Sequence, residues 1–440
     1  MGILMLPTML IVAMFFGLGL DTGLWYYDHR WAQTQADAAA ASAIVFLPAD
    51  PNDFQRIADA YEAANSWLTR NGSDRAVDNT CPRSDGRNGV SVYSDWPNPA
   101  DTRLNTVRVC VRRQRDSLFA QLSGVSGVYV SAQAAAQVVD EPSPYSLMAM
   151  NETAADTLRV HGPAVWINGG GGTYTRSRLR VEDCEGALNS TGVNEVVRVD
   201  VVECAANVDP RPIQGSILED PFEDLMQPVA IGSCQLTMLG SNITSTPPSP
   251  LSPGRYCYQL RITSPSGGPN STVRLNPGLY VLEQGLQLGP RSTLTGDAND
   301  NGMLDPSEQV LLYSTCQAPP VPCNVSGSTV RIAGGIDFLA GSIVQLAGLG
   351  TMSNMVIWVD RTSGWNSANP LGSQVQITGE SDTILNGRIY AYTSHVEMEG
   401  EMTVNMSIVA DNIKFSGNDP INVSYSATLA PPLRIRGIIE

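Results

Sequence analysis

A run of acidic and amide side chains between residues 297 and 308 has the spacing of a cation-binding loop. It reads DANDNGMLDPSE, with glycine at the sixth position and glutamate at the twelfth. Oxygen atoms at loop positions 1, 3, 5, 7, 9 and 12 are able to surround one Ca²⁺, the seventh through its backbone carbonyl. The predicted ligands are Asp297, Asn299, Asn301, Met303, Asp305 and Glu308.

The flanks of this loop predict strands rather than helices. RSTLTG precedes it at 291–296 and QVLLYS follows it at 309–314. We therefore expect a structural calcium clip between strands, not a sensor that opens on binding. Because two ligands are amides in place of carboxylates, we expect an affinity of about 10⁻⁴–10⁻³ M. The alternative is an Asp/Asn-rich turn that holds no metal.

The chain has 8 cysteines and no Cys-x-x-Cys, a spacing that argues against zinc-ribbon and thioredoxin-like sites. An even number in Gly- and Asn-rich sequence favours disulfides formed in an oxidising compartment, with buried free thiols as the alternative. Cys316 and Cys323 flank a short proline-containing segment whose ends can meet. If the other bridges also close local loops, the pairs are Cys81–Cys110, Cys184–Cys204 and Cys234–Cys257.

Composition narrows the class of protein. Of 440 residues, 42% are hydrophobic and only 16% are charged, with 40 glycines and 29 prolines, which is typical of extracellular all-β proteins. The net charge of −16, with no local cluster of Lys or Arg, argues against a nucleic-acid partner. The 3 histidines are far apart in sequence and predict no His-based site.

The first region, 1–47, is predicted to be one long hydrophobic helix. Residues 3–20 carry no charge, and Trp25, Tyr26 and Tyr27 follow, as at a membrane interface. Alanine-rich sequence then continues without Gly or Pro to Phe46, so the helix should run over 3–46 as a transmembrane or filament-core element. A cleaved signal peptide and a buried core helix are the alternatives. No basic residue precedes the apolar run, so we expect a native start upstream of Met1 or a leader already removed.

A small α/β region is predicted over 48–140. Apolar residues recur at helical spacing from Phe54 to Trp67, and Asn71-Gly72 ends that pattern. Alternating apolar residues then predict strands at 90–95 and 106–113, and a further strand within 128–139.

Residues 3–140 resemble the TadE/TadG-like pilus-assembly proteins of tight-adherence (Flp) systems. The resemblance rests on the apolar helix, then LDTGLWY at 20–26, then QTQADAAA at 33–40. It implies a pilin-like protein anchored or assembled through its N-terminal helix, with copies of itself or other pilins as partners. Two features depart from the pattern: basic residues before the helix are absent, and position 5 is Met5 where type IV pilins have glutamate.

The third region, 141–440, is predicted to be all-β. Short strands alternate with Gly, Asn, Asp and Pro turns, and STVR occurs at both 271–274 and 328–331. Self-similarity near twenty residues favours a right-handed parallel β-helix, the domain that large TadG-like proteins often carry. A β-sandwich is the alternative, since frequent turns fit it as well.

These features predict a surface-exposed, non-enzymatic, pilin-like structural or pilus-assembly protein. Its N-terminal helix would sit in the membrane or in a filament, and surface glycans are a further expected partner. The alternative is a membrane-tethered β-helical polysaccharide-active enzyme or adhesin. An enzyme of this kind needs clustered acids. Asp360-Arg361 and the acids at 380 and 382 are scattered instead, and we expect them to lie in solvated turns.

Overall fold

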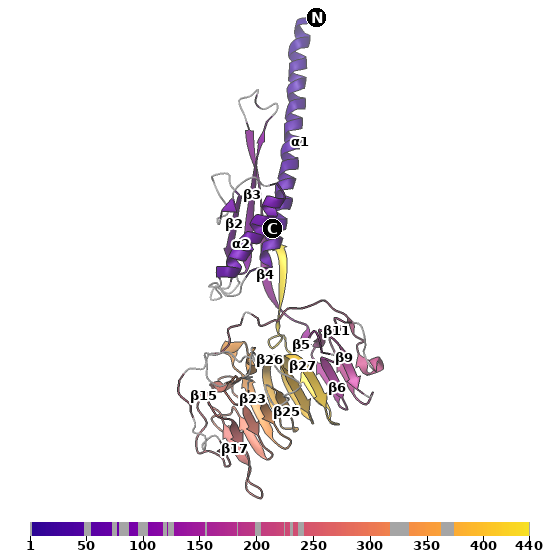
Figure 1. Cartoon of the computed structure of the whole chain (residues 1–440). Coiled ribbons are helices and arrows are strands. Elements are labelled where there is room, and N and C mark those ends of the chain that lie inside the picture. The colour runs from indigo at the N-terminus through magenta and orange to yellow at the C-terminus, as the bar shows by residue number, and fades with distance from the viewer. Residues whose placement is uncertain are drawn as a thin grey trace. The chain divides into compact units, whose positions relative to one another are not determined.

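The computed structural model describes residues 2–47, 54–72, 77–78, 88–95, 104–117, 121, 127–154, 156–182, 184–198, 204–223, 225–228, 232–235, 242–316, 334–361 and 374–439. The chain forms two compact units (Figure 1). Unit 1 comprises Met1–Glu141 and Leu433–Glu440, and unit 2 comprises Pro142–Pro432. Unit 2 is thus an insertion in unit 1. The last residues of the chain, which the sequence placed in the third region, belong to the first unit.

Unit 1 combines two helices with one sheet. The helices are α1 (Gly2–Ile44) and α2 (Phe54–Arg70). The sheet has the order β1-β2-β3-β4-β29, in which β1 and β2 are parallel and β2, β3 and β4 are antiparallel. Its strands are β1 (Val77–Asp78), β2 (Asn88–Tyr93), β3 (Thr106–Asp116), β4 (Gly127–Pro142) and β29 (Pro432–Ile439).

An alanine-rich face of α1 makes the core of unit 1. Alanine favours the helix and leaves room for close approach, so α1 packs tightly on α2 and on the valines of β3. The buried cluster contains Ala32, Ala36, Ala39, Ala40 and Ala43 of α1, Ala60, Ala64 and Leu68 of α2, and Val107, Val109 and Val111 of β3.

The single N-terminal helix predicted over 3–46 is observed as α1. Among the residues that the structure describes, no helix has the length and apolarity needed to cross a membrane. Asp21 and Asp28 interrupt the apolar character of α1, and both carboxylates are buried within unit 1.

Unit 2 is a large all-β unit. Its first strands are β5 (Tyr145–Ala149), β6 (Leu158–His161), β7 (Ala164–Asn168), β8 (Gly172–Thr175), β9 (Leu179–Glu182), β10 (Ala187–Ser190), β11 (Asn194–Val196), β12 (Val208–Asp209), β13 (Ile213–Gln214) and β14 (Asn242–Ile243). They are followed by β15 (Gly254–Tyr256), β16 (Leu260–Ile262), β17 (Ser271–Arg274), β18 (Gly278–Leu282), β19 (Leu286–Leu288), β20 (Ser292–Thr295), β21 (Gln309–Ser314), β22 (Ile336–Phe338), β23 (Ile343–Gly348), β24 (Met355–Val359), β25 (Val375–Thr378), β26 (Ile384–Glu399), β27 (Met402–Ser416) and β28 (Ile421–Ser424). Short 3₁₀ turns lie at Ala205–Asn207 and Gly350–Met352.

The strand pairings described in unit 2 are parallel, whereas a β-sandwich is built from antiparallel sheets. Most strands pair with the strand three places further along the chain, as β15 with β18 and β18 with β21. We call each set of three successive strands a coil and the whole arrangement the stack. β26 and β27 are long strands that extend through more than one column of the stack.

Alternate side chains of each strand point into the stack and form its core. In one column Leu286, Ile336 and Val375 lie in register on successive strands, and Phe338 and Ile377 lie beside them. These side chains are all fully buried. Regular alternation of apolar residues, which the sequence shows in most of these strands, is therefore explained by a single interior.

Candidate functional site

The second half of α1 is fixed to the sheet by polar contacts as well as by alanine packing. The Asp21 carboxylate accepts a 2.6 Å hydrogen bond from the Ser117 hydroxyl. The Asp28 carboxylate, 1% exposed, lies 3.3 Å from the guanidinium of Arg113 and 3.4 Å from that of Arg115. Buried carboxylates need such partners, so these contacts fix the rotation of the helix about its axis.

Further along α1, side chains contact the backbone of β4. His29 Nδ1 lies 3.1 Å from the Ser131 carbonyl, and the Gln33 amide donates to the Gln133 carbonyl at 3.1 Å. The helix is thus fixed in register along the strand from Asp21 onward.

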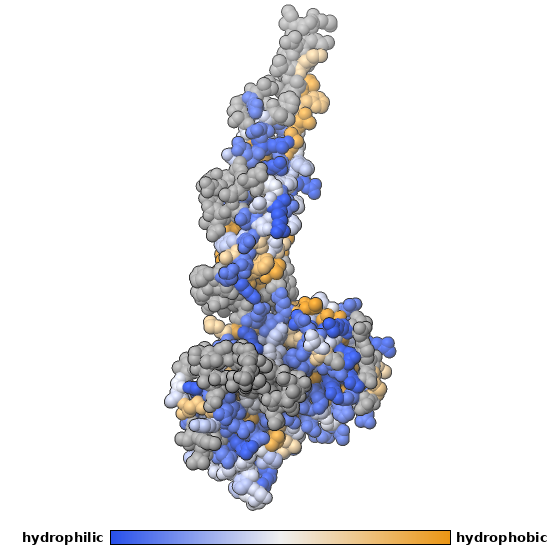
Figure 2. Space-filling view, in the orientation of Figure 1, coloured by the Kyte–Doolittle hydropathy of each residue, from blue (hydrophilic) through white to orange (hydrophobic). Residues whose placement is uncertain are grey.

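Before Asp21, the described side chains of α1 are exposed and mostly apolar. The exposed large side chains are Met9, Val12, Phe15, Phe16, Leu18 and Leu20. Figure 2 shows hydrophobic residues along the open side of this helix. Phe16 alone is 73% exposed. A contiguous apolar surface of this kind on one helix is typical of an association surface.

Two glycines on α1 leave space for a close neighbour. A Cβ atom added at Gly19 or Gly23 would meet nothing within 4 Å. Tyr26 and Tyr27, one turn further along, are also exposed. The exposed apolar side chains described in this half of α1 can therefore accept another apolar helix or an apolar solvent phase.

The predicted calcium ligands are gathered in one loop between β20 and β21, so the flanking elements are strands, as the sequence indicated. The Asp297 carboxylate, 7% exposed, accepts hydrogen bonds from the backbone N–H of Asn301 at 3.1 Å and of Gly302 at 2.7 Å. Gly302 has φ +79°, a conformation that strongly favours glycine and that gives the sharp turn.

The other two acids among the predicted ligands, Asp305 and Glu308, also accept hydrogen bonds within the loop. Glu308, 4% exposed, accepts from the backbone N–H groups of Asn299 and Asp305, each at 3.1 Å. The Asp305 carboxylate accepts from the side-chain amides of Asn299 and Asn301, each at 3.0 Å. Rotating either amide by 180° would present an oxygen instead, the atom that Ca²⁺ requires.

The non-ligating fourth position behaves differently from its neighbours. Asp300 pairs with Arg274 outside the loop and is 65% exposed. Within the described residues, no group of three or more His, Cys, Asp or Glu side chains stands out as a metal site. The predicted ligand set also includes two amides and a backbone carbonyl, and the calcium site stays a prediction.

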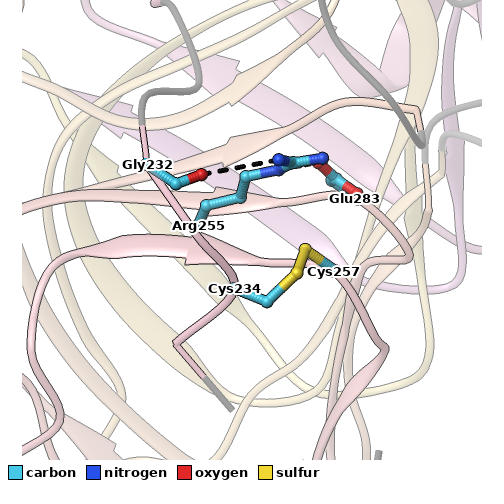
Figure 3. The surroundings of a disulfide bond; sticks show 5 residues. All are labelled: Gly232, Cys234, Arg255, Cys257 and Glu283. Carbon is cyan, nitrogen blue, oxygen red and sulfur yellow. Dashed lines mark hydrogen bonds and ion pairs between the residues drawn. A yellow bond between two sulfur atoms is a disulfide. The ribbon is translucent and has the colours of Figure 1, made fainter. Parts of the chain in front are cut away.

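Both locally paired disulfides that the structure describes agree with the expected sequential pairing. Cys184 bonds Cys204, and Cys234 bonds Cys257 (Figure 3). Cys110 and Cys316 are also disulfide-bonded. Cys81 and Cys323 lie outside the described residues, so the pairs Cys81–Cys110 and Cys316–Cys323 remain predictions.

The two disulfides Cys184–Cys204 and Cys234–Cys257 lie at opposite ends of the stack. Cys204 precedes β12 and β13, whose pairing partners are β10 and β11. Cys234 forms a parallel bridge with Arg255 of β15 at the other end. Near it the Arg255 guanidinium pairs with the buried Glu283 carboxylate (Figure 3). Terminal coils have a neighbour on one side only, so a covalent link there limits fraying.

Asp360 and Arg361, expected to form a solvated turn, do not. Asp360 is 5% exposed and accepts hydrogen bonds from the hydroxyls of Tyr313 at 2.9 Å and Thr315 at 2.8 Å. Arg361 donates to Tyr390 and to backbone carbonyls of a distant segment. Glu380 and Asp382 are exposed, as expected. The signal for burial at this position is the unbroken apolar strand MVIWV, which ends at Val359 directly before Asp360.

Comparison with known proteins adds little. No family model matches the chain, so the resemblance to TadE/TadG-like proteins is not accompanied by a family match. No curated protein matches it either. Among solved structures, the competence-associated pilin ComZ from Thermus thermophilus is similar over 83% of this chain and 85% of that chain, with 10% sequence identity and a TM-score of 0.26. Similarity at that level does not establish a shared fold.

Proposed function

We propose that the chain is a surface-exposed, pilin-like structural or pilus-assembly protein that assembles through α1. The observation that carries the proposal is the division of α1 at Asp21. Beyond it the helix is fixed to its own sheet, and before it the described apolar side chains are exposed. A helix that is packed in one half and exposed in the other can join a larger assembly through its exposed half while unit 1 stays folded.

The energetics favour a partner for the open half. Burying an exposed aliphatic or aromatic side chain contributes about 1.5–3 kcal/mol. Phe15, Phe16, Leu18 and Leu20 together therefore provide a substantial driving force. The partners that we propose are copies of this chain or other pilins, with the membrane as the apolar phase that holds the helix before assembly.

For unit 2 we propose a right-handed parallel β-helix that projects from the surface and has no catalytic role. Parallel pairing at an interval of three strands supports this architecture, and right-handed crossover connections are the rule for parallel strands. Exposed outer faces of such a stack would meet the exterior, where surface glycans are the partner that we propose. The chain would accordingly be located at the cell surface or in an extracellular filament.

We further propose that the loop from Asp297 to Glu308 binds Ca²⁺ as a structural clip. What supports this is the buried position of the first and last acids and the hydrogen bonds that both accept from the loop backbone. The cation would neutralise carboxylates that otherwise repel one another. It would join β20 to β21 and so link successive coils.

The test of the main proposal is assembly of the full chain against a chain that lacks residues 2–20. The cut leaves Asp21 and the packed half of α1 in place. We expect the full chain to form oligomers or filaments, seen by light scattering and electron microscopy. The truncated chain should stay monomeric, and the β-strand contribution to its circular dichroism should be unchanged.

Point variants sharpen that test. Phe16→Asp should reduce assembly strongly, because it places a charge on the open apolar surface. Ile217→Asp is the matched control, since Ile217 is 66% exposed on unit 2. Equal loss of assembly in both variants, or full assembly of the truncated chain, would exclude α1 as the assembly element.

A further inference from the structure

The coils of unit 2 are not stacked in the order of the chain. β27, near the end of unit 2, pairs with β5 and β6 at its beginning, and β28 pairs with β7. The coils from β5 to β13 therefore continue the winding that β15 to β28 began. The coils are thus stacked as in one continuous winding, but the chain enters this winding at β5 and leaves it at β28, in the middle of the stack.

A return segment has to connect the two free ends of this stack. β13 ends at Gln214 at one end, and Cys234 bridges Arg255 at the other. We call the described residues 215–223 and 225–228 the strap. Its contacts follow the stack in order: Leu218 N–H donates to the Tyr174 hydroxyl of β8 at 2.9 Å, and the Gln227 amide donates to Asp360 after β24 at 3.2 Å.

The strap lies on an apolar ladder on the outer side of the stack. The ladder residues lie in register on neighbouring strands and are Val281, Tyr313, Trp358, Tyr390, Val409, Met148 and Tyr174. All are at most 4% exposed, although they point away from the interior. Phe222 is buried in the same cluster, and Leu218 and Leu225 pack against it. Charged residues bound the ladder, Arg255 next to Val281 and Glu195 next to Tyr174.

One arginine holds the middle of the strap. The Arg361 guanidinium donates to the carbonyls of Glu223 at 3.1 Å, Leu225 at 3.0 Å and Phe222. It also donates to the Tyr390 hydroxyl at 2.7 Å, and that hydroxyl donates to Asp220 of the strap. The Phe222 ring meets the Tyr390 ring edge to face, with centroids 5.5 Å apart.

These contacts differ in kind from those within the stack. Neighbouring strands are joined by rows of backbone hydrogen bonds, whereas the strap contacts named above all use a side chain on at least one partner. Side-chain contacts can break one at a time, whereas the backbone hydrogen bonds between two strands open cooperatively.

We propose that the strap is a clamp that opens separately from the stack, with Arg361 as its latch. In the closed state it carries the chain from one end of the stack to the other and covers the apolar ladder. In the open state the ladder is exposed while the coils remain paired.

The experiment is amide hydrogen exchange measured by mass spectrometry on the full chain, comparing Arg361→Ala with the native protein. Hydrogen bonds to charged groups contribute about 1.5–3 kcal/mol, so exchange within 216–223 should become roughly ten- to a hundredfold faster. Exchange in β24 and β26 should stay unchanged. Arg261→Ala is the matched control, because Arg261 is a guanidinium on the outer face that bonds Gln287 and not the strap.

A second variant separates latch from packing. Phe222→Ala removes the ring from the ladder and should speed exchange in the same peptide, again without effect on β24 and β26. If strap and strand peptides accelerate together in both variants, the strap is part of one cooperative unit and the proposal is wrong. Unchanged exchange in 216–223 in Arg361→Ala would equally overturn it.

Discussion

The backbone N–H of Ser143 donates to the carbonyl of Pro431 at 2.9 Å, which places the entry and the exit of unit 2 side by side. In unit 1, β4 and β29 are likewise neighbours in one sheet. An insertion whose ends meet can be accommodated between two adjacent strands without disturbing the host sheet. The same geometry explains the order of the coils, because the stack has to open where its ends are joined to unit 1.

Deleting residues 433–440 should destabilise β4. Removal of β29 leaves one edge of β4 without its partner, so amides in β4 should exchange faster by about tenfold or more, while those of unit 2 should not change. Hydrogen exchange of the full chain and the shortened chain checks this, with a chain lacking only Glu440 as control. Unaltered protection of β4 would mean that β29 contributes nothing to the sheet.

The disulfide Cys184–Cys204 should stabilise the end of the stack. It closes a loop with a sequence separation of 20, and bridges of this kind contribute about 2–4 kcal/mol. Replacing both cysteines by serine should lower the free energy of unfolding by that amount in urea titrations and should speed amide exchange in β11 to β13. The pair Cys234–Cys257 provides the matched comparison at the opposite end.

Alkylation without reduction extends this test to the whole chain. We expect no labelled thiol among the cysteines at 81, 110, 184, 204, 234, 257, 316 and 323. Labelling at 81 or 323 would contradict the sequential pairing.

Local pattern was sufficient to predict the elements but not how they are joined. The helix α1 follows from an apolar run and the alanine-rich run after it, and the pair Cys184–Cys204 follows from closeness in sequence. The pairing of β27 with β5 is invisible to such reasoning, because parallel strands bring together residues that no short-range spacing relates. In α2 the predicted apolar pattern ended at Trp67, yet Trp67 is exposed and Leu68 is buried, since the position of α1 decides which side is covered.

The strap was missed for a different reason. Strands such as MVIWV at 355–359 lack polar alternation, which indicates burial on both sides. The sequence of the strap has no periodicity of its own. Its role emerges only from the contacts of Phe222 and Arg361, which are tertiary.

Stability of unit 2 should fall as the pH decreases from about 6.5 toward 4. Burial lowers the pKa of His395 from 6.5 to about 4, with Lys414 and Arg159 acting in the same direction and Glu397 opposing. Between these values the unfolded chain binds a proton that the folded chain does not, so the contribution is complete above the upper value and is lost toward the lower one.

Thermal denaturation at a series of pH values measures this effect. His395→Asn should flatten the curve in that window and leave the behaviour above pH 7 unchanged. A native protein whose stability is constant from pH 6.5 to 4, after subtraction of the variant's curve, would show that His395 does not titrate as stated.

Calcium should stabilise unit 2 through the loop from Asp297 to Glu308. Binding to the folded state alone contributes RT ln(1 + [L]/Kd), about 1.4 kcal/mol at tenfold saturation. Chelation should therefore lower the melting temperature modestly and speed proteolysis around the exposed Met303.

Asp297→Asn and Glu308→Gln keep the shape of each side chain while removing its charge, and each should abolish the calcium dependence. Asp300→Asn, at the position paired with Arg274, should retain it. Isothermal titration calorimetry with CaCl₂ measures the affinity directly. If millimolar Ca²⁺ gave neither heat of binding nor a shift in melting temperature, the loop would be a hydrogen-bonded turn that does not bind calcium.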